Sequence, residues 1–180
     1  MNSNRRIKLV ADILLIQCMM LSVSSCGHRP DSSSPESFLG AKLYVPEEVV
    51  ENSVTGNHIV TFMNLRNCRS CTLKELQFWD DFLYAFANRQ AEADNIADIV
   101  FIVNVPETED LKGLFSQKKE ICRINVFYDE EDRFVSNNVL PDDDQYHCFL
   151  IDNSKQIKLI GKPIFNSSLF DKYLDILTLK

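Results

Sequence analysis

The sequence is poor in several residue types, and their scarcity narrows the fold class. Only five of its 180 residues are glycine, six are proline and three are histidine. Few glycines and prolines, together with 45% hydrophobic residues, are typical of an ordinary globular chain that buries a core. The sequence has no internal repeat, and its length favours one domain once any targeting segment is removed.

Positive charge is also scarce. The chain has 19 Lys and Arg against 26 Asp and Glu, which gives a net charge of −7. Residues 1–25 contribute +2, so the remaining residues carry −9. An acidic body of this kind disfavours nucleic acid as a partner and offers no polybasic patch to a membrane surface.

A long apolar run is absent as well. The run Ile13 to Val23 is too short for a comfortable membrane span. Basic residues precede this run and small residues follow it, so residues 1–25 are predicted to be a secretory signal. The segment Leu21 to Gly27 resembles the lipobox of bacterial lipoproteins, in which the cysteine, here Cys26, is acylated and begins the mature chain. This resemblance implies a bacterial cell-envelope protein held on a membrane by acyl chains such as palmitate, facing the periplasm. An ordinary signal peptide with an incidental cysteine is the alternative.

Residues 26–37 follow the signal and are rich in Ser and Pro. They cannot bury apolar surface, so we expect a disordered tether between Cys26 and a domain at residues 38–180. His28 lies in this tether and is expected to be inert, and His58 is expected at the surface at the start of a strand.

Strand and helix patterns alternate through residues 38–180. The helix at residues 72–88 has an apolar stripe that includes Trp79 and an opposite charged side with Lys74, Glu75, Asp80 and Asp81. The order predicts an α/β fold, a mixed β-sheet with helices on both faces. The expected strands are 38–45, 58–63, 97–103, 124–128, 148–152 and 156–160, and the expected helices are a turn from Pro46, then 72–88, 107–119, a short one near 131–136, and 166–179.

The segment Cys68-Arg69-Ser70-Cys71 joins the strand 58–63 to the helix 72–88. Two cysteines at this spacing can close a small disulfide ring whose first sulfur faces solvent and exchanges with other thiols. A helix N-terminus and the charge of Arg69 are both expected to lower the pKa of Cys68. Zinc sites also use this spacing, but the sequence has no second CxxC and no Cys/His pair at zinc-finger spacing, so no metal site is assigned.

These features resemble the thioredoxin superfamily, and most closely its membrane-tethered TlpA-type thiol–disulfide oxidoreductases. The resemblance runs from Leu39 to Lys180 and rests on residues 59–62, the Cys68–Cys71 pair, Trp79, and residues 148–152 with their hairpin and Gly161. It implies a thioredoxin-like fold, a Cys68–Cys71 disulfide with Cys68 as the attacking thiol and Cys71 as the resolving thiol, and no organic cofactor. The implied partners are exported cysteine-containing proteins and a redox partner protein.

Three positions depart from that family's pattern. Asn67 stands where an aromatic residue usually precedes the first cysteine, and Phe62 stands where many members carry a buried acid. Tyr146 occupies the position of the family's cis-proline, whose loop normally holds the substrate, and the nearest proline is Pro141. By this alignment Tyr146 and His147 form the substrate-facing loop.

These departures keep other interpretations open. The second is a non-catalytic, thioredoxin-like interaction lipoprotein with a structural disulfide, and the third is copper delivery by the two cysteines with His147. Cys148 is expected to be a buried apolar residue, with a third redox thiol as the alternative, and Cys122 is expected to be structural. Asp142 to Asp144 lack the spacing of a known calcium loop and predict a solvated acidic turn. The threonine–cysteine peroxide pocket of peroxiredoxins is absent from the sequence, which disfavours a peroxidase.

Overall fold

The computed structural model describes residues 34–50, 56–90 and 98–178. The expected signal at residues 1–25, Cys26, His28 and most of the expected tether lie outside these residues. None of the helices in the described ranges combines the length and apolarity that a bilayer span requires.

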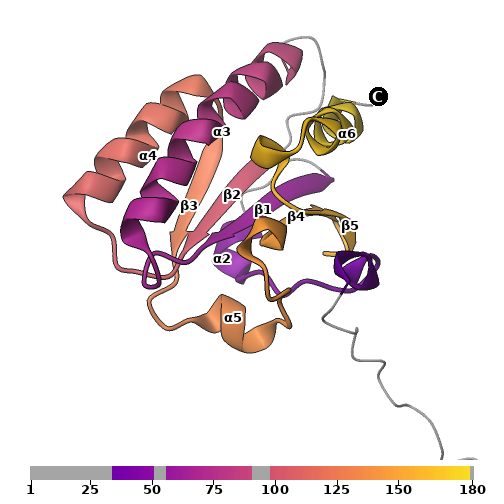
Figure 1. The fold of residues 1–180 in the computed structure, drawn as a ribbon, viewed down its shortest axis with the longest axis horizontal. Helices are drawn as coiled ribbons and strands as arrows, with labels where there is room; N and C mark the ends of the chain where they lie inside the picture. Colours follow the sequence, from indigo (N-terminus) through magenta and orange to yellow (C-terminus); the bar gives the residue numbers. More distant parts are fainter. Residues whose placement is uncertain (1–33, 51–55, 91–97, 179–180) are drawn as a thin grey trace, which may run out of the picture. The chain divides into compact units, whose positions relative to one another are not determined.

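The described part of the chain is built on one five-stranded sheet (Figure 1). Strand β1 runs parallel to β2, β2 runs parallel to β3, and β4 and β5 are antiparallel additions beyond β1. This confirms the predicted mixed sheet of an α/β fold. The order across the sheet is β3-β2-β1-β4-β5, and the strands are β1 Asn57–Met63, β2 Asp98–Val103, β3 Ile124–Tyr128, β4 Cys148–Asp152 and β5 Ile157–Ile160.

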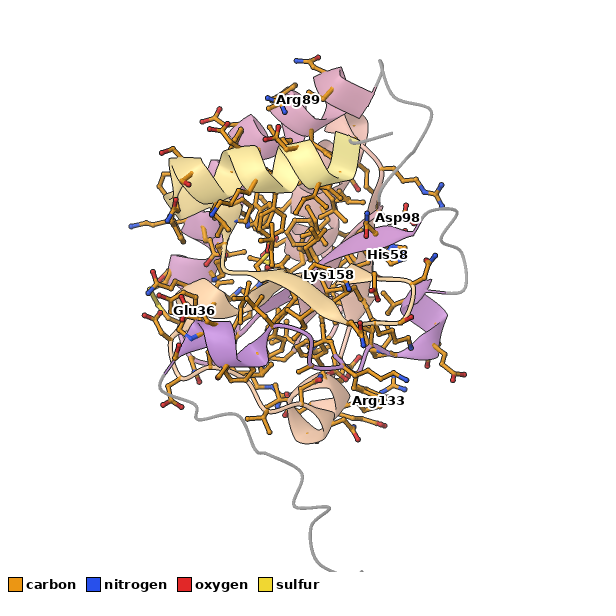
Figure 2. All side chains as sticks on the ribbon, turned by 90° about the vertical axis from the view of Figure 1, so that its right-hand side faces the viewer. Glu36, His58, Arg89, Asp98, Arg133 and Lys158 are labelled. Atoms are coloured by element: carbon orange, nitrogen blue, oxygen red, sulfur yellow. A yellow bond between two sulfur atoms is a disulfide. The ribbon has the colours of Figure 1, made fainter. Side chains whose placement is uncertain are left out.

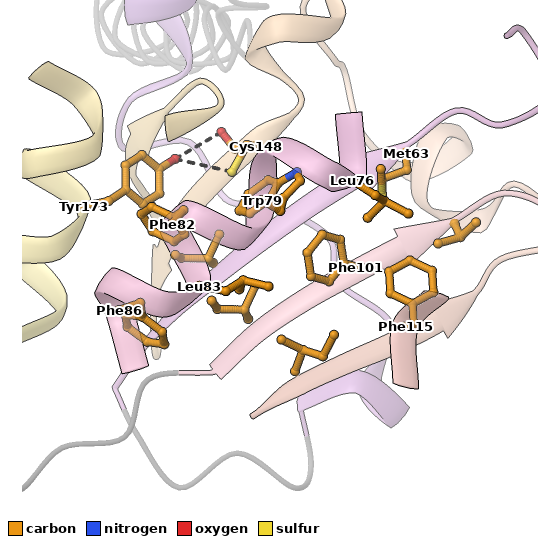
Figure 3. Packing of buried hydrophobic residues seen from close by; sticks show 14 of the residues in the cluster. Met63, Leu76, Trp79, Phe82, Leu83, Phe86, Phe101, Phe115, Cys148 and Tyr173 are labelled. Atoms are coloured by element: carbon orange, nitrogen blue, oxygen red, sulfur yellow. Dashed lines mark hydrogen bonds between the residues drawn. The ribbon is translucent and has the colours of Figure 1, made fainter. Parts of the chain in front are cut away.

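Three long helices cover one face of the sheet. They are α3 Arg69–Gln90, α4 Glu109–Ile121 and α6 Ser167–Thr178, and Figure 1 shows α3 and α4 running alongside one another. Successive side chains of a strand point to opposite faces, so Ile59 and Met63 of β1 pack under these helices. The buried stripe of α3 meets them at helical spacing and contributes Leu76, Trp79, Phe82, Leu83 and Phe86 (Figure 3).

Short elements cover the opposite face. Val60 and Phe62 of β1 pack there in a second core against the chain ahead of β1 and against α5 Arg133–Asn137. The helical turn expected from Pro46 is present as α2 Glu47–Val50. Helices therefore lie on both faces as predicted, but the long ones all share one face.

The chain ahead of β1 differs from the sequence prediction in two ways. Pro35–Phe38, expected to end a disordered tether and begin a strand, forms a 3-10 turn whose Phe38 is 2% exposed. The strand expected at 38–45 is reduced to one isolated bridge, Lys42 with Gln156, because Gly40 turns the backbone at φ 79° and interrupts regular pairing. Phe38 is buried in the second core and holds this segment against the sheet. The Ser- and Pro-rich composition of the segment did not indicate that burial.

His58 was expected at the surface, and the structure buries it to 4% exposure. It lies directly opposite Asp98 in the β1–β2 register, and Figure 2 shows both side chains on the same side of the molecule, where these two strands begin. Burial lowers the pKa of His58, and the Asp98 carboxylate partly offsets that effect. This cluster lies at the end of β1 that is remote from Cys68.

Tyr173 of α6 joins the helical layer to the sheet. Its buried hydroxyl donates to Gly161 O at 3.0 Å. The same hydroxyl lies 3.4 Å from Cys148 O, a contact marked by a dashed line in Figure 3. Gly161 has a φ of 110°, a conformation that strains residues with a Cβ, so this bond holds an unusual turn in place. Burial strongly raises the pKa of Tyr173, so its hydroxyl stays a donor.

We expect Tyr173→Phe to lower the free energy of unfolding by about 1–2 kcal/mol, because the Gly161 carbonyl loses its buried donor. Urea denaturation measures this change. Tyr84→Phe is the matched control, since Tyr84 is 57% exposed and should leave stability unchanged. Equal stability of the two variants would contradict the structural role assigned to the Tyr173 hydroxyl.

Candidate functional site

Cys68 and Cys71 are joined by a disulfide between the end of β1 and the start of α3. Their Cα atoms are 5.3 Å apart, within the normal range for a disulfide. The predicted pairing at a strand-to-helix junction is therefore present. Thr72 N–H donates to Cys68 O at 3.1 Å, so Cys68 sits immediately ahead of the first helical turn and close to its unpaired amides.

A polar network holds the loop that leads into the disulfide. Asn104, buried at the end of β2, accepts the Leu65 N–H at 3.0 Å and donates to Asn64 Oδ1 at 3.0 Å. Asn64 Oδ1 also accepts the Asn67 N–H at 3.3 Å. These bonds fix the backbone between β1 and Cys68 from a neighbouring strand. Asn64 and Asn104 carry no signal of this role in the sequence, since each is a single polar residue just beyond a predicted strand.

The exposure of the two cysteines differs from the sequence prediction. Cys68, expected to face solvent, is only partly exposed, and Cys71 is the exposed member of the pair. The helix explains this difference: Cys71 shares the outer side of α3 with Lys74 and Phe78, outside the stripe that packs on the sheet. Cys68 lies inward of that side, with its sulfur 3.7 Å from Ser70 Oγ.

Arg69 lies at the first position of α3, which begins three residues before the predicted helix 72–88. Its guanidinium is 3.8 Å from the carboxylate of Asp110 at the start of α4, and both side chains are exposed. An exposed pair of this kind is weak. Arg69 therefore places a positive charge near the disulfide, and the negative charge of Asp110 partly offsets it.

The disulfide borders an open cleft of about 270 Å³. One wall is α3, with Thr72, Glu75 and Phe78. The rest of the cleft is formed by two 3-10 turns that were not predicted from the sequence. Asp144 comes from η2 Asp144–Tyr146, and Phe165 comes from η3 Pro163–Phe165. Lys162 N–H donates to Gln145 O at 2.7 Å and so ties these two walls together.

Tyr146 and His147 do not line this cleft, and Asp144 is the residue of their loop that does. The His147 ring is turned toward Phe62 on the opposite face of the sheet, with Nε2 2.7 Å from Pro141 O. All peptide bonds in the described residues are trans, including that before Tyr146. The backbone ahead of β4 still meets β1, because Phe62 N–H donates to His147 O at 2.9 Å.

The orientation of His147 bears on the copper interpretation. In the part of the chain that the structure describes, no three His, Cys, Asp or Glu side chains are grouped as metal ligands. His147 is not brought together with Cys68 and Cys71. No observation favours copper delivery by these residues.

Glu75 is a largely buried residue that lines the same cleft as the disulfide, and the sequence placed it on the charged side of α3. Its side chain is 14% exposed, and Oε2 accepts a hydrogen bond from Lys162 Nζ at 2.7 Å, where Lys162 is itself 5% exposed. Within the described residues Glu75 Oε1 and the Trp79 Nε1 one turn further along α3 are buried without a hydrogen-bond partner. The sequence held no signal for this burial, because Lys162 follows Glu75 by 87 residues.

The remaining described cysteines, Cys122 and Cys148, are free and do not line the cleft. Cys148 is fully buried, and burial raises the pKa of its thiol to about 12. Burial likewise raises the pKa of Cys122 to about 11. Thiols this difficult to ionise are poor nucleophiles, which supports the expected packing role of Cys148 and the structural role of Cys122.

After mild reduction at pH 8 we expect iodoacetamide to label Cys68 and Cys71 rapidly and Cys148 hardly at all, because roughly one Cys148 thiol in ten thousand is ionised at that pH. Cys122 should be labelled slowly, with a rate that rises roughly tenfold per pH unit up to pH 10. Peptide mapping by mass spectrometry measures each site separately. Labelling in urea is the control and should be uniform; rapid labelling of native Cys148 would contradict its burial.

The chain was compared with known proteins. No family model matches it, and no curated protein matches it. Among solved structures it is similar to the thioredoxin domain of a thiol-disulfide oxidoreductase from Bacteroides vulgatus, with 15% sequence identity and a TM-score of 0.42 over 68% of this chain and 79% of that chain. Independently of that neighbour, the strand order β3-β2-β1-β4-β5 and the disulfide at the start of α3 agree with the thioredoxin-like α/β fold that the sequence resemblance implies.

Proposed function

We propose that this chain exchanges disulfides with other proteins through Cys68 and Cys71. The observation that carries the proposal is a disulfide at a helix N-terminus that borders an open cleft with one exposed cysteine. Exchange needs an accessible sulfur and a leaving thiolate that its surroundings stabilise. Cys68 is partly exposed and borders the cleft, which meets the first requirement. Cys71 is exposed in the first turn of α3, where solvent and the helix N-terminus stabilise its thiolate, which meets the second.

The exchange proceeds in two steps. An incoming thiolate attacks one sulfur, the Cys68–Cys71 bond breaks, and the released cysteine leaves as a thiolate. The released thiolate can re-form the original bond, or a second thiolate can attack the mixed disulfide and complete the transfer of two electrons. In the reduced state Cys68 is the attacking thiol and Cys71 the resolving thiol. The reverse exchange follows the same path: in the oxidised state an incoming thiolate attacks Cys68, which borders the cleft, and Cys71 leaves as a thiolate.

The location and the partners are part of the same proposal. The pattern of residues 1–25 and the lipobox-like segment ending at Cys26 support export and acylation in a bacterial cell envelope, facing the periplasm. Disulfides persist in such oxidising compartments, and the cysteine-containing proteins found there supply partners. A redox partner protein would restore the site after each exchange.

A second function is supported by a specific observation. The loop ahead of β4 carries Tyr146 and His147 instead of a proline, and neither residue lines the cleft. Without a substrate-holding loop, the disulfide would brace the start of α3 and exchange with no partner. On this interpretation the chain is an interaction lipoprotein and the disulfide is structural.

Dithiothreitol-driven reduction of insulin separates the two functions. We expect the full chain to accelerate the reaction, Cys68→Ser to abolish the acceleration, and Cys71→Ser to stop turnover while accumulating mixed disulfides at Cys68. Cys122→Ser is the control and should retain activity, since that thiol lies outside the cleft. A wild-type rate equal to that of dithiothreitol alone would refute exchange and leave the structural role.

The lipid anchor has its own test. In a bacterial host supplied with labelled palmitate, the wild-type chain should be labelled and should sediment with membranes. Cys26→Ser should lose the label, while Cys18→Ser, a cysteine inside the expected signal, should keep it. Labelling of the Cys26→Ser chain at the wild-type level would exclude acylation at this residue.

A further inference from the structure

The cleft contains an apolar surface that the exchange chemistry does not use. Phe78 of α3 and Phe165 of η3 are 56% and 55% exposed, and their rings meet edge to face with centroids 6.0 Å apart. Both line the cleft that also contains Cys68 and Cys71. Single exposed apolar residues are common on protein surfaces, but two in contact beside a candidate reactive disulfide indicate a binding surface. We call these two residues the phenylalanine pair.

Helix geometry sets the distance from the disulfide to the pair. Phe78 follows Cys71 by seven residues, which corresponds to about 10 Å along α3. An extended polypeptide covers that distance in about three residues. Successive side chains of an extended segment point to opposite faces, so a segment whose cysteine meets the disulfide places the side chain two or four positions away over the phenylalanine pair.

The charge around the cleft indicates the sign of the partner. Asp144, whose side chain is 66% exposed, lines the cleft, and Asp142 and Asp143 are exposed beside it. Lys74 is an exposed cation on the opposite wall, while Glu75 is paired with Lys162. The negative end at Asp142 to Asp144 favours a cationic segment, and the acidic body of the chain reinforces this preference at long range.

Building on the proposed exchange function, we propose that this cleft binds an extended, cysteine-bearing segment of the partner protein. The segment carries an aromatic or large aliphatic residue two or four positions from its cysteine, which packs on Phe78 and Phe165, and a Lys or Arg that faces Asp144. A second copy of this chain is disfavoured as the occupant, because it would bring two acidic rims together.

Reduction of the disulfide by synthetic peptides tests the docking. A capped peptide with one cysteine attacks the Cys68–Cys71 bond, and a second peptide thiol attacks the mixed disulfide. The products are one peptide disulfide and two protein thiols, so two electrons pass from the peptides to the protein. Alkylation followed by mass analysis of the fragment that contains both cysteines gives the rate at this site in the full chain.

The peptide set isolates each contact. One peptide carries Phe two positions from its cysteine together with a Lys, a second replaces the Phe by Ala, and a third replaces the Lys by Glu. The protein variants are Phe78→Ala, Phe165→Ala and Asp144→Asn. Tyr84→Ala is the matched control, because Tyr84 is a 57% exposed aromatic residue of the same helix that does not line the cleft. 2-Mercaptoethanol, which has no side chain to dock, measures the reactivity of the disulfide itself.

We expect the wild-type chain to react about tenfold faster with the Phe peptide than with the Ala peptide. The preference should fall to within about twofold in Phe78→Ala and Phe165→Ala and persist in Tyr84→Ala, with unchanged 2-mercaptoethanol rates throughout. Asp144→Asn should reduce a roughly threefold preference for the Lys over the Glu peptide.

Three results would overturn the inference. Equal rates for the Phe and Ala peptides with a normal 2-mercaptoethanol rate would refute the docking surface and leave the exchange function standing. A disulfide that reacts with every thiol, 2-mercaptoethanol included, no faster than an unstructured disulfide would refute the exchange function and the docking with it. Concentration-dependent dimerisation that Phe78→Ala abolishes would assign the surface to a second copy.

Discussion

Packing of the apolar stripe of α3 on the sheet is the interaction on which the candidate site depends. Trp79 and Phe82 are fully buried, and Trp79 lies edge to face against Phe101 of β2 with ring centroids 5.2 Å apart. Because the helix cannot rotate without exposing these rings, the side of α3 that faces solvent is fixed as well. Cys71 and Phe78 lie on that outer side, so the core determines what the cleft presents.

Buried polar groups complete the frame around the disulfide. The Asn104–Asn64 contacts hold the incoming loop, and the Glu75–Lys162 pair links α3 to the segment that leads into η3. A buried ion pair is weak evidence for stability, since the cost of removing both charges from water offsets much of their attraction. Its geometric effect is clearer: it fixes Lys162 beside α3, and Phe165 follows three residues later against Phe78.

Local sequence patterns were sufficient to locate most of the strands and helices. Apolar runs and helical periodicity located the five observed strands and the three long helices to within a few residues, because burial on a sheet imposes those patterns directly. The prediction of a regular strand at residues 38–45 was wrong, because burial of apolar residues does not by itself require regular strand pairing. Phe38, Leu43 and Val45 are buried, but Gly40 and contacts with the β5 edge leave them in irregular backbone.

The sequence by itself determined the α/β order and the place of the Cys68–Cys71 pair between a buried strand and an amphipathic helix, since both follow from residues close together in the chain. Only the tertiary structure decided which cysteine is exposed, that Glu75 is buried, and that Asp144 and Phe165 share a cleft with the disulfide. Those outcomes depend on contacts between segments separated by about 70 to 95 residues, as Glu75 and Lys162 illustrate with 87. The periodicity within one element does not encode which distant turn will pack against it. For that physical reason the sequence determined the elements, and only the tertiary structure decided which of them meet at the cleft.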